Sequence, residues 1–263
     1  MESGPSHIDI YKMFDRIAGR YDLLNGILSF GLDSLWRRSA AKYLKPKNSL
    51  EVLDLATGTG DLLISLISHQ QNIRHAVGID MSENMLTIAK KKIGSANLSD
   101  RITLIRADTA RIPFADNSFD AVTIAFGIRN MPDIDIVLKE MYRVLRPSGT
   151  ALILEFALPE KTFLRKLFLF YLRNIVPLVG GVISGNRNAY RYLNQTIETF
   201  PFGEDFCNIM RKAGFANTKT TPLTFGIACL YTGDKIFTQN RKMTNSGQYK
   251  STPVPLWADV ENL

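Results

Sequence analysis

The sequence contains few of the residues from which disulfide scaffolds and metal sites are built. Its 263 residues include only two cysteines, Cys207 and Cys229, and three histidines, His7, His69 and His75. Neither cysteine has the spacing of a metal ligand or a histidine close in sequence, so we expect both to be small core residues and not nucleophiles. We also expect the histidines to lie away from the functional site. The sequence therefore predicts no metal centre.

Long uncharged apolar runs are absent as well. The most apolar stretch, residues 161–183, is interrupted by Arg165, Lys166 and Arg173, and a membrane span needs about 18 or more uncharged residues. No basic segment followed by an apolar one marks a signal peptide, so we expect a cytoplasmic protein. The formal charge of +7 and the pI near 9.4 suit an anionic surface, either nucleic acid or phospholipid.

The composition predicts one large domain and a tail. Hydrophobic residues make up 45% and aromatic residues 10% of the chain, which is ordinary for a globular protein, and the length suits a single α/β domain. From about Asn240 the chain is polar and loses its periodicity. We therefore expect a domain over 1–239 and a flexible tail over 240–263.

From Leu50 onward, strand patterns alternate with helix patterns, whereas residues 9–44 read as a helical lid or outer layer. The predicted strands are 51–56, 75–80, 102–107, 119–125, 150–156, 217–222 and 225–232, and the predicted helices are 61–69, 83–93, 133–145 and 205–213. This alternation predicts a seven-stranded, mostly parallel, Rossmann-like sheet with helices on both faces and an antiparallel hairpin at its edge. Ligands of such sheets bind beyond the carboxyl ends of the strands.

A glycine-rich loop directly after the first strand is the strongest functional signal. It runs from Asp54 to Asp61 with the sequence DLATGTGD. Gly58 and Gly60 allow a sharp turn and a close approach of a ligand to the next helix. Asp80 ends the second strand, about 20 residues on, where it can accept hydrogen bonds from ribose hydroxyls. The pattern fits either a dinucleotide or S-adenosylmethionine.

The acidic residues of this loop favour S-adenosylmethionine. A phosphate-binding turn needs bare N–H groups without a fixed negative charge, but Asp54 and Asp61 bracket the loop. Carboxylates suit a ligand that carries an ammonium and a sulfonium group. We therefore predict S-adenosyl-L-methionine as the cofactor.

Two further groups follow predicted strands. Asp108 and Thr109 come after the third strand, where Asp108 can accept from the adenine amine or, alternatively, cap a turn. Arg129 and Asn130 lie just beyond the fourth strand and are candidates for chemistry or substrate orientation. For Arg129 the alternative is a structural ion pair with Asp133 or Glu155.

The stretch 161–175 is amphipathic and basic. On a helical wheel its lysines and arginines occupy one arc and its leucines and aromatic residues the other. Such a helix can lie on an anionic membrane, where each cation contributes about 1 kcal/mol. It can equally pack its apolar face on the protein core, and the pattern alone slightly favours that alternative.

With these motifs the chain resembles the menaquinone/ubiquinone-biosynthesis C-methyltransferases, enzymes of the class I S-adenosylmethionine-dependent fold. The resemblance runs from about Met13 to Lys235. The shared motifs are FDRIA from Phe14, YDLLN from Tyr21, SFG from Ser29, WR from Trp36, DLATGTGD from Asp54, FGIRN from Phe126, MYRVLRP from Met141 and LEF from Leu154. FGIRN and LEF are specific to the family and not to the fold.

The resemblance implies cofactor contacts at Thr59, Asp80, Asp108 and Thr109. It also shows departures. Ser148 stands where the family usually has a glycine, and Ala125 stands where many members have a serine that reaches the cofactor. The tail has no counterpart in the family.

The implied reaction is methylation of a ring carbon of a polyprenylated quinol whose neighbouring hydroxyl loses its proton. Arg129 is the candidate to stabilise the phenolate by charge; at about 4 Å and an effective dielectric of 20 this contributes roughly 4 kcal/mol. Asn130 would orient the ring, and Tyr21, Asp22 and Tyr192 would line a lid above it. Residues 161–200 would form a helical insertion that faces substrate and membrane.

The identity of the quinol stays open at this stage. Demethylmenaquinol is favoured on general resemblance, and the methoxy-polyprenyl-benzoquinol of ubiquinone biosynthesis is the alternative. More distant alternatives are a nucleic-acid methyltransferase, a dehydrogenase and a protein that binds the cofactor without turnover. The nucleic-acid alternative is disfavoured because FGIRN replaces the Asn-Pro-Pro-aromatic signature of base-flipping enzymes. A homodimer is compatible with the sequence.

Overall fold

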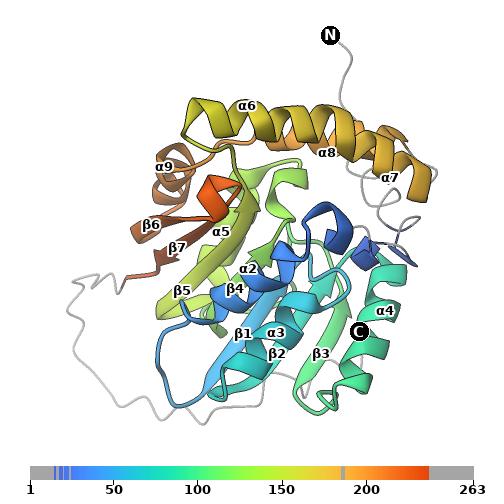
Figure 1. The fold of residues 1–263 in the computed structure, drawn as a ribbon. Coiled ribbons are helices and arrows are strands. Elements are labelled where there is room, and N and C mark those ends of the chain that lie inside the picture. Colours follow the sequence, from blue (N-terminus) through green and yellow to red (C-terminus); the bar gives the residue numbers. More distant parts are fainter. Residues whose placement is uncertain (1–14, 16–17, 20, 24, 185–186, 237–263) are drawn as a thin grey trace, which may run out of the picture.

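A seven-stranded sheet runs through the computed structural model, which describes residues 15, 18–19, 21–23, 25–184 and 187–236 (Figure 1). The strand order is β3-β2-β1-β4-β5-β7-β6. The strands are β1 Leu50–Leu55, β2 Ile73–Asp80, β3 Ile102–Arg106, β4 Phe119–Ala125, β5 Leu145–Phe156, β6 Ala216–Leu223 and β7 Ala228–Asp234. β1 to β5 pair in parallel, and β7 pairs antiparallel with β5 and β6. The predicted sheet and its antiparallel edge are thus confirmed.

Two strand starts, those of β5 and β7, differ most from the expected ones, for local reasons. β5 begins at Leu145 because this residue already pairs with Phe119 across a bulge. β7 begins only at Ala228, because Thr224–Gly226 forms a 3₁₀ turn in which Phe225 has a left-handed backbone (φ 58°). Side-chain alternation alone does not reveal such a turn.

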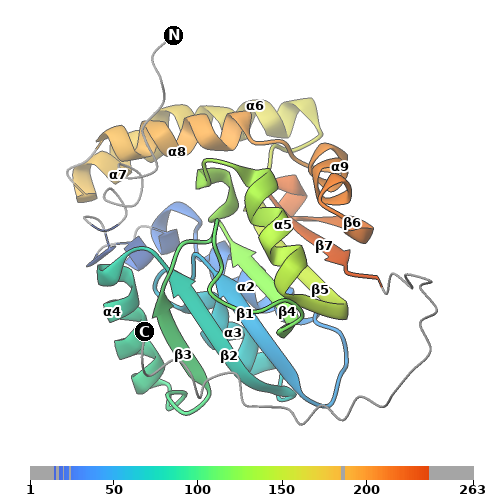
Figure 2. The ribbon, with the colours of Figure 1, turned by 180° about the vertical axis from the view of Figure 1, so that it is seen from behind.

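Helices cover both faces of the sheet. They are α2 Leu32–Ala41, α3 Asp61–His69, α4 Glu83–Ser95, α5 Ile134–Val144, α6 Thr162–Phe170, α7 Val176–Ser184, α8 Arg187–Thr199 and α9 Glu204–Lys212. α2, α3 and α4 pack on one face, and α5 and α9 pack on the other (Figures 1 and 2). Side-chain caps fix two helix starts, since Ser82 accepts from Met85 N–H and Asp133 from Ile136 N–H.

A third layer crosses the carboxyl ends of the parallel strands. It consists of α6, a π-helical turn Tyr171–Ile175, α7 and α8, which lie together at the top of Figures 1 and 2. A small core of its own holds this layer, formed by Phe168, Leu172, Val176 and Ile197. The layer lies within 161–200, and the expectation that this insertion faces substrate and membrane stays a prediction. No helix in the described ranges is long and apolar enough to cross a membrane.

The predicted lid at 9–44 divides into two parts. α2 forms part of the outer layer, the second alternative considered for this stretch, because Trp36, Ala40 and Ala41 are buried against the sheet and α3. The described residues before Leu32 lie nearer the strand ends, where Tyr21 lines a cavity. The predicted tail at 240–263 lies outside the described residues.

Candidate active site

A small cavity, about 100 Å³, lies at the carboxyl ends of β1, β2 and β4, where the strand order changes direction. Its lining residues are Tyr21, Ala56, Gly58, Asp80, Met81, Ser82, Met85, Thr109, Ala125, Phe126, Gly127, Asn130 and Met131. Three predicted cofactor residues, Gly58, Asp80 and Thr109, therefore come together here. Ala125, noted as a departure from the family, lines the same wall.

Asp80 is fixed by backbone donors on both sides. The N–H of Gly58, whose φ of 56° suits glycine, donates to Asp80 Oδ2 at 2.8 Å, and the N–H of Ser82 donates to Oδ1 at 2.9 Å. Burial raises the pKa of Asp80, although these backbone bonds oppose the shift. A carboxylate offers about four acceptor positions, so Asp80 can still accept from the hydroxyls of a ribose.

The other predicted cofactor residues do not line the cavity. Asp54 is 1% exposed and accepts from Thr123 Oγ1 at 2.6 Å, and burial raises its pKa to about 7. Gly60 starts α3 with φ 82°, and a Cβ there would lie 3.3 Å from Ala89 Cβ of α4. Asp108 caps a turn by accepting from Ala110 N–H at 2.8 Å. In this structure these residues shape the loops around the cavity.

Thr59 does not line the cavity either, and its predicted cofactor contact stays a prediction; here its side chain bonds to the N-terminal segment. Its hydroxyl donates to Asp22 Oδ1 at 2.6 Å. Lys92 of α4 donates to Asp22 Oδ2 at 2.7 Å and also forms an ion pair with Asp61. Nearer the N-terminus, Asp15 accepts from the Ser82 hydroxyl at 2.6 Å. The described residues around Tyr21 are thus tied to the glycine-rich loop and to α4 beside the small cavity.

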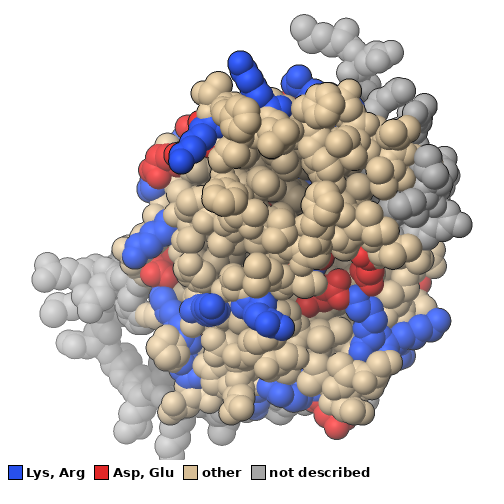
Figure 3. All heavy atoms as spheres, viewed as in Figure 1, with Lys and Arg blue, Asp and Glu red and all other residues tan. Residues whose placement is uncertain are grey.

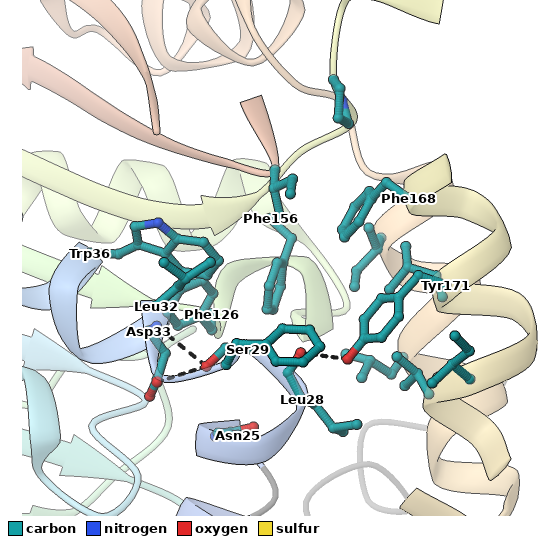
Figure 4. A pocket seen from close by; sticks show the side chains of 18 of the residues that line it. Asn25, Leu28, Ser29, Leu32, Asp33, Trp36, Phe126, Phe156, Phe168 and Tyr171 are labelled. Atoms are coloured by element: carbon teal, nitrogen blue, oxygen red, sulfur yellow. Dashed lines mark hydrogen bonds between the residues drawn. The ribbon is translucent and has the colours of Figure 1, made fainter. Parts of the chain in front are cut away.

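A second cavity, about 450 Å³ and thus larger than the cavity at the strand ends, is predominantly aromatic and aliphatic (Figure 4). It lies between the start of α2, the ends of β4 and β5, and the layer formed by α6 and the π-helical turn. Trp36, Phe126 and Phe156 form its aromatic floor, with ring centroids 4.7–6.0 Å apart. Across from them Tyr171 donates its hydroxyl to Leu28 O at 2.8 Å. Such a cavity suits a flat ring that carries an apolar chain.

The two cavities meet at three residues. Tyr21, Phe126 and Asn130 line both of them. Ligands in the two cavities would therefore face each other at this junction, which is the geometry that a group transfer requires.

Beside the junction, Arg129 forms a buried ion pair with Glu155. Its Nη1 lies 2.6 Å from Glu155 Oε1 and donates to Phe126 O at 2.7 Å. Of the alternatives considered from the sequence, the pair with Glu155 is present, whereas Asp133 caps α5. Arg129 therefore does not face the large cavity as an uncompensated cation.

Two polar atoms at this point are buried without a partner. They are Arg129 Nε, a donor, and Asn130 Oδ1, an acceptor. Buried polar groups are almost always paired, so an unpaired donor and acceptor on adjacent residues indicate a ligand site. Tyr192 lines the same cavity, and burial raises its pKa while the charge of Arg129 opposes this.

The large cavity has a second polar wall, formed by residues that were not among the predicted site residues. Asp33 and Arg37 of α2 form a buried ion pair there, and Ser29 donates to Asp33. The spacing of four residues between an acid and an arginine on a helix was the available signal. That both side chains face a cavity follows only from the packing of α2 on the sheet.

No cluster of residues that could hold a metal ion occurs in the described part of the chain. His69 ends α3, and His75 lies near the start of β2, away from the strand ends, as expected. His7 lies outside the described residues. Cys207 and Cys229 are buried and free, in agreement with the predicted core role.

The small cavity fits the predicted cofactor. Its side-chain polar groups include the acceptors Asp80 and unpaired Asn130 Oδ1, which match the hydroxyl and ammonium donors of S-adenosylmethionine. Backbone can approach closely at Gly127, where a Cβ would lie 2.9 Å from Ala56 Cβ.

Comparison with known proteins agrees with this geometry. Residues 3–235 match the model of the ubiE/COQ5 methyltransferase family. A protein of Bacteroides fragilis named demethylmenaquinone methyltransferase is 42% identical over 88% of this chain and 94% of its own length. A Geotalea daltonii protein named ubiquinone/menaquinone biosynthesis C-methyltransferase UbiE is 44% identical over 86% of this chain and 96% of its own length.

Among solved structures, a putative S-adenosyl-L-methionine-dependent methyltransferase of Methanococcus maripaludis is similar in fold. Its TM-score is 0.61 at 19% identity, over 91% of this chain and 99% of that one. The predicted fold class, cofactor and role as a methyltransferase in quinone biosynthesis are thereby confirmed. This chain belongs to the ubiE/COQ5 methyltransferase family.

Proposed function

We propose that this methyltransferase acts on a ring carbon of a polyprenylated quinol, and that demethylmenaquinol is the substrate. The observation that carries the proposal is the large, mostly apolar cavity that meets the cofactor cavity at Tyr21, Phe126 and Asn130. The name of the Bacteroides fragilis relative supports the menaquinone branch. The methoxy-polyprenyl-benzoquinol is the second candidate, supported by the name of the Geotalea daltonii relative.

In the proposed mechanism the protein positions an electron-rich ring at the junction of the cavities. Bound S-adenosylmethionine supplies an electrophilic methyl group. Phe126 and Phe156 line the cavity in which the ring would lie, and Asn130 orients the ring from a position that borders both cavities. The cofactor side of the site is formed by Gly58, Asp80 and Thr109. The loops that carry these residues are shaped by Asp54, Thr59, Gly60 and Asp108.

Arg129 acts on the ring hydroxyl in this proposal through a directed hydrogen bond. Its Nε–H has no partner in the protein and can donate to the oxygen next to the methylated carbon, which stabilises the phenolate. The Glu155 carboxylate compensates much of the positive charge. The shift in the phenol pKa is therefore smaller than the roughly three units that a lone cation at about 4 Å would give.

We further propose that the rim of the large cavity lies on an anionic membrane. Phe163, Leu167 and Phe170 of α6 are 76%, 58% and 59% exposed and share one helix face, so the helix does not pack this face on the core. Phe30 and Phe225 are exposed near the same cavity. Figure 3 shows a broad area without charged side chains on this face, with lysine and arginine at its upper edge.

Charge contributes less to this contact than the helical wheel predicts. Lys161 and Lys166 are exposed, but Arg165 donates to Pro159 O and Arg173 pairs with Glu198. Two cations instead of four lie free at the surface of α6, a contribution of about 2 kcal/mol. Most of the membrane affinity is then expected from the apolar side chains.

Flotation with vesicles tests the membrane contact. We expect the double variant Phe163→Ser/Leu167→Ser to bind vesicles that contain anionic lipid at least about tenfold more weakly than the wild-type chain, because two large apolar side chains no longer enter the lipid. Ile136→Ser is the matched control, since Ile136 is 44% exposed on α5. Equal binding of all three proteins would contradict the contact.

Rates with the two quinols, supplied separately in reduced vesicles, test the substrate. We expect the higher kcat/KM with demethylmenaquinol. A higher value with the benzoquinol would move the assignment to the ubiquinone branch, and turnover of neither would remove the quinol proposal.

The homodimer with which the sequence is compatible stays a prediction, and sedimentation of the purified chain tests it.

A further inference from the structure

The large cavity contains a carboxylate, that of Asp33, which takes no part in the proposed methyl transfer. Among the described residues that line this cavity, Asp33 is the only acidic one. It lies on α2, and Figure 4 shows it beside Ser29, Trp36 and Phe126. A buried charge in a mostly apolar cavity is costly, so its presence requires either a structural or a ligand-binding reason.

The Asp33 carboxylate is fixed but not saturated. Ser29 donates to its Oδ1 at 2.8 Å, Arg37 pairs with its Oδ2, and the N–H of Ser34 also donates to it. The Asp33 and Arg37 side chains are only 11% and 8% exposed. Because a carboxylate has about four acceptor positions, one position remains for a donor in the cavity. The neighbouring arginine keeps the carboxylate ionised, and it can therefore only accept.

Two ion pairs flank the aromatic floor of the cavity. Arg37 lies over the ring of Phe126, 5.6 Å from its centroid, and Arg129 lies over the ring of Phe156 at 5.2 Å. The two rings are 4.7 Å apart. One flank thus offers the unpaired Nε–H donor of Arg129, and the other offers the acceptor of Asp33. A quinol bears two oxygens on opposite sides of its ring, one for each flank.

The two redox forms of the substrate differ at these oxygens. A quinol hydroxyl donates a hydrogen bond, whereas a quinone carbonyl only accepts. A carboxylate therefore binds the first and repels the second. An unfavourable contact with the wrong ligand discriminates as effectively as a favourable contact with the right one.

We propose that Asp33, held by Ser29 and Arg37, accepts a hydrogen bond from the quinol hydroxyl remote from the methylated carbon and thereby selects the quinol over the quinone. Asp33 is thus a positioning residue that distinguishes the reduced substrate from the oxidised one. The inference rests on the proposed quinol substrate. It explains why an acid lies in a cavity otherwise suited to a prenylated ring.

Calorimetric titration under anaerobic conditions tests this selectivity. The chain with bound S-adenosylhomocysteine is titrated with a monoprenylated naphthoquinol and separately with its quinone. We expect the wild-type chain to bind the quinol about tenfold or more tightly, as one charge-assisted hydrogen bond predicts. In Asp33→Asn the amide can donate to a carbonyl, so the preference falls to about threefold or less and the quinone binds more tightly than before.

Further measurements separate recognition from stability. The mono-methyl ether at the remote hydroxyl lacks the donor, and we expect its affinity to be no weaker in Asp33→Asn than in the wild-type chain. Asp135→Asn, an exposed acid on α5, is the matched control. If Asp33→Asn does not fold because Arg37 loses its partner, the double variant Asp33→Asn/Arg37→Gln replaces it. With Ser29→Ala, which leaves the ion pair in place, we expect a smaller loss of the preference.

The possible results distinguish failure of the role inferred for Asp33 from failure of the proposed quinol substrate. Equal weakening of quinol and quinone by Asp33→Asn would make Asp33 a structural residue and overturn this inference. The proposed function would then stand, because the wild-type chain would still bind the quinol. Binding of neither form by the wild-type chain would overturn both.

Discussion

Arg129 Nη1 lies 2.6 Å from Glu155 Oε1, and the two side chains are 4% and 0% exposed. Glu155 also accepts from the N–H of Phe156 at 2.8 Å, so the pair ties the end of β5 to the 3₁₀ turn Ile128–Asn130 that follows β4. A buried pair of this kind places the arginine precisely and compensates its charge. The proposed catalytic group of Arg129 is therefore its unpaired Nε–H.

The double variant Arg129→Gln/Glu155→Gln separates this catalytic role from the structural one. Arg129→Gln alone leaves a buried unpaired carboxylate, and we expect it to lower the free energy of unfolding by about 3–5 kcal/mol. The double variant replaces both charges by amides and regains most of that stability. It should still bind S-adenosylmethionine but turn over quinol at least about a hundredfold more slowly. Urea unfolding and methyl transfer measure the two effects.

Near wild-type turnover by a folded double variant would contradict a catalytic role for Arg129. Loss of cofactor binding in the double variant would instead indicate that the pair serves the small cavity. In that case the role of Arg129 would be structural.

Lys92 holds the N-terminal segment over the cofactor cavity, since it pairs with both Asp22 and Asp61. In Lys92→Met two carboxylates face each other without a cation, and Tyr21, which borders both cavities, is held less firmly. We expect the Kd for S-adenosylmethionine to rise about fivefold, the equivalent of about 1 kcal/mol. Lys91→Met, at an exposed neighbouring position, is the control. Equal Kd values for the two variants would show that Lys92 does not act on the cofactor site.

The sequence predicted the sheet well, because its strands follow from regular patterns. The strand periodicity and the glycine loop placed Asp80 and Gly58 correctly at the strand ends. The sequence did not determine which residues of the glycine loop face the cavity. Asp54 and Thr59 neighbour Gly58 in the chain, but their side chains bond to Thr123 and Asp22.

Contacts between distant segments account for what the sequence left undetermined. α2 resembles a lid in its helical pattern, yet Trp36 donates to Thr224, 188 residues away, and packs in the core. The acid–arginine pair on α2 faces a cavity only because of this packing. Similarly, Glu155 was one of two candidate partners of Arg129, and only the pairing of β4 with β5 selects it.

Asp54 makes the stability of the fold depend on pH. Burial raises its pKa from 3.8 to about 7, so between these values the folded chain keeps a proton that the unfolded chain releases. Stability therefore falls as pH rises through this window and levels off above it. We expect Asp54→Asn, which stays neutral, to gain stability relative to the wild-type chain from pH 4 to pH 7. Urea unfolding at several pH values measures the difference, and a constant difference would contradict the raised pKa.

Ser148 is strained by its backbone. Its φ is 67°, a left-handed conformation that favours glycine, and the residue is exposed in the irregular start of β5. We expect Ser148→Gly to raise the free energy of unfolding by about 0.5–1 kcal/mol without changing methyl transfer. Ser118→Gly, at a residue without a positive φ, is expected to destabilise instead. A loss of stability in Ser148→Gly would show that its φ carries no strain.

The position of the transferred methyl group tests most directly whether this chain methylates a ring carbon of a quinol. The chain is incubated with S-adenosylmethionine that carries an isotopically labelled methyl group and with demethylmenaquinol in reduced vesicles, and the extracted lipid is analysed by NMR. The account predicts label on the ring carbon beside a hydroxyl, and little label when the quinone is supplied without a reductant. Label on an oxygen, or none on the quinol while the cofactor is shown to bind, would contradict it.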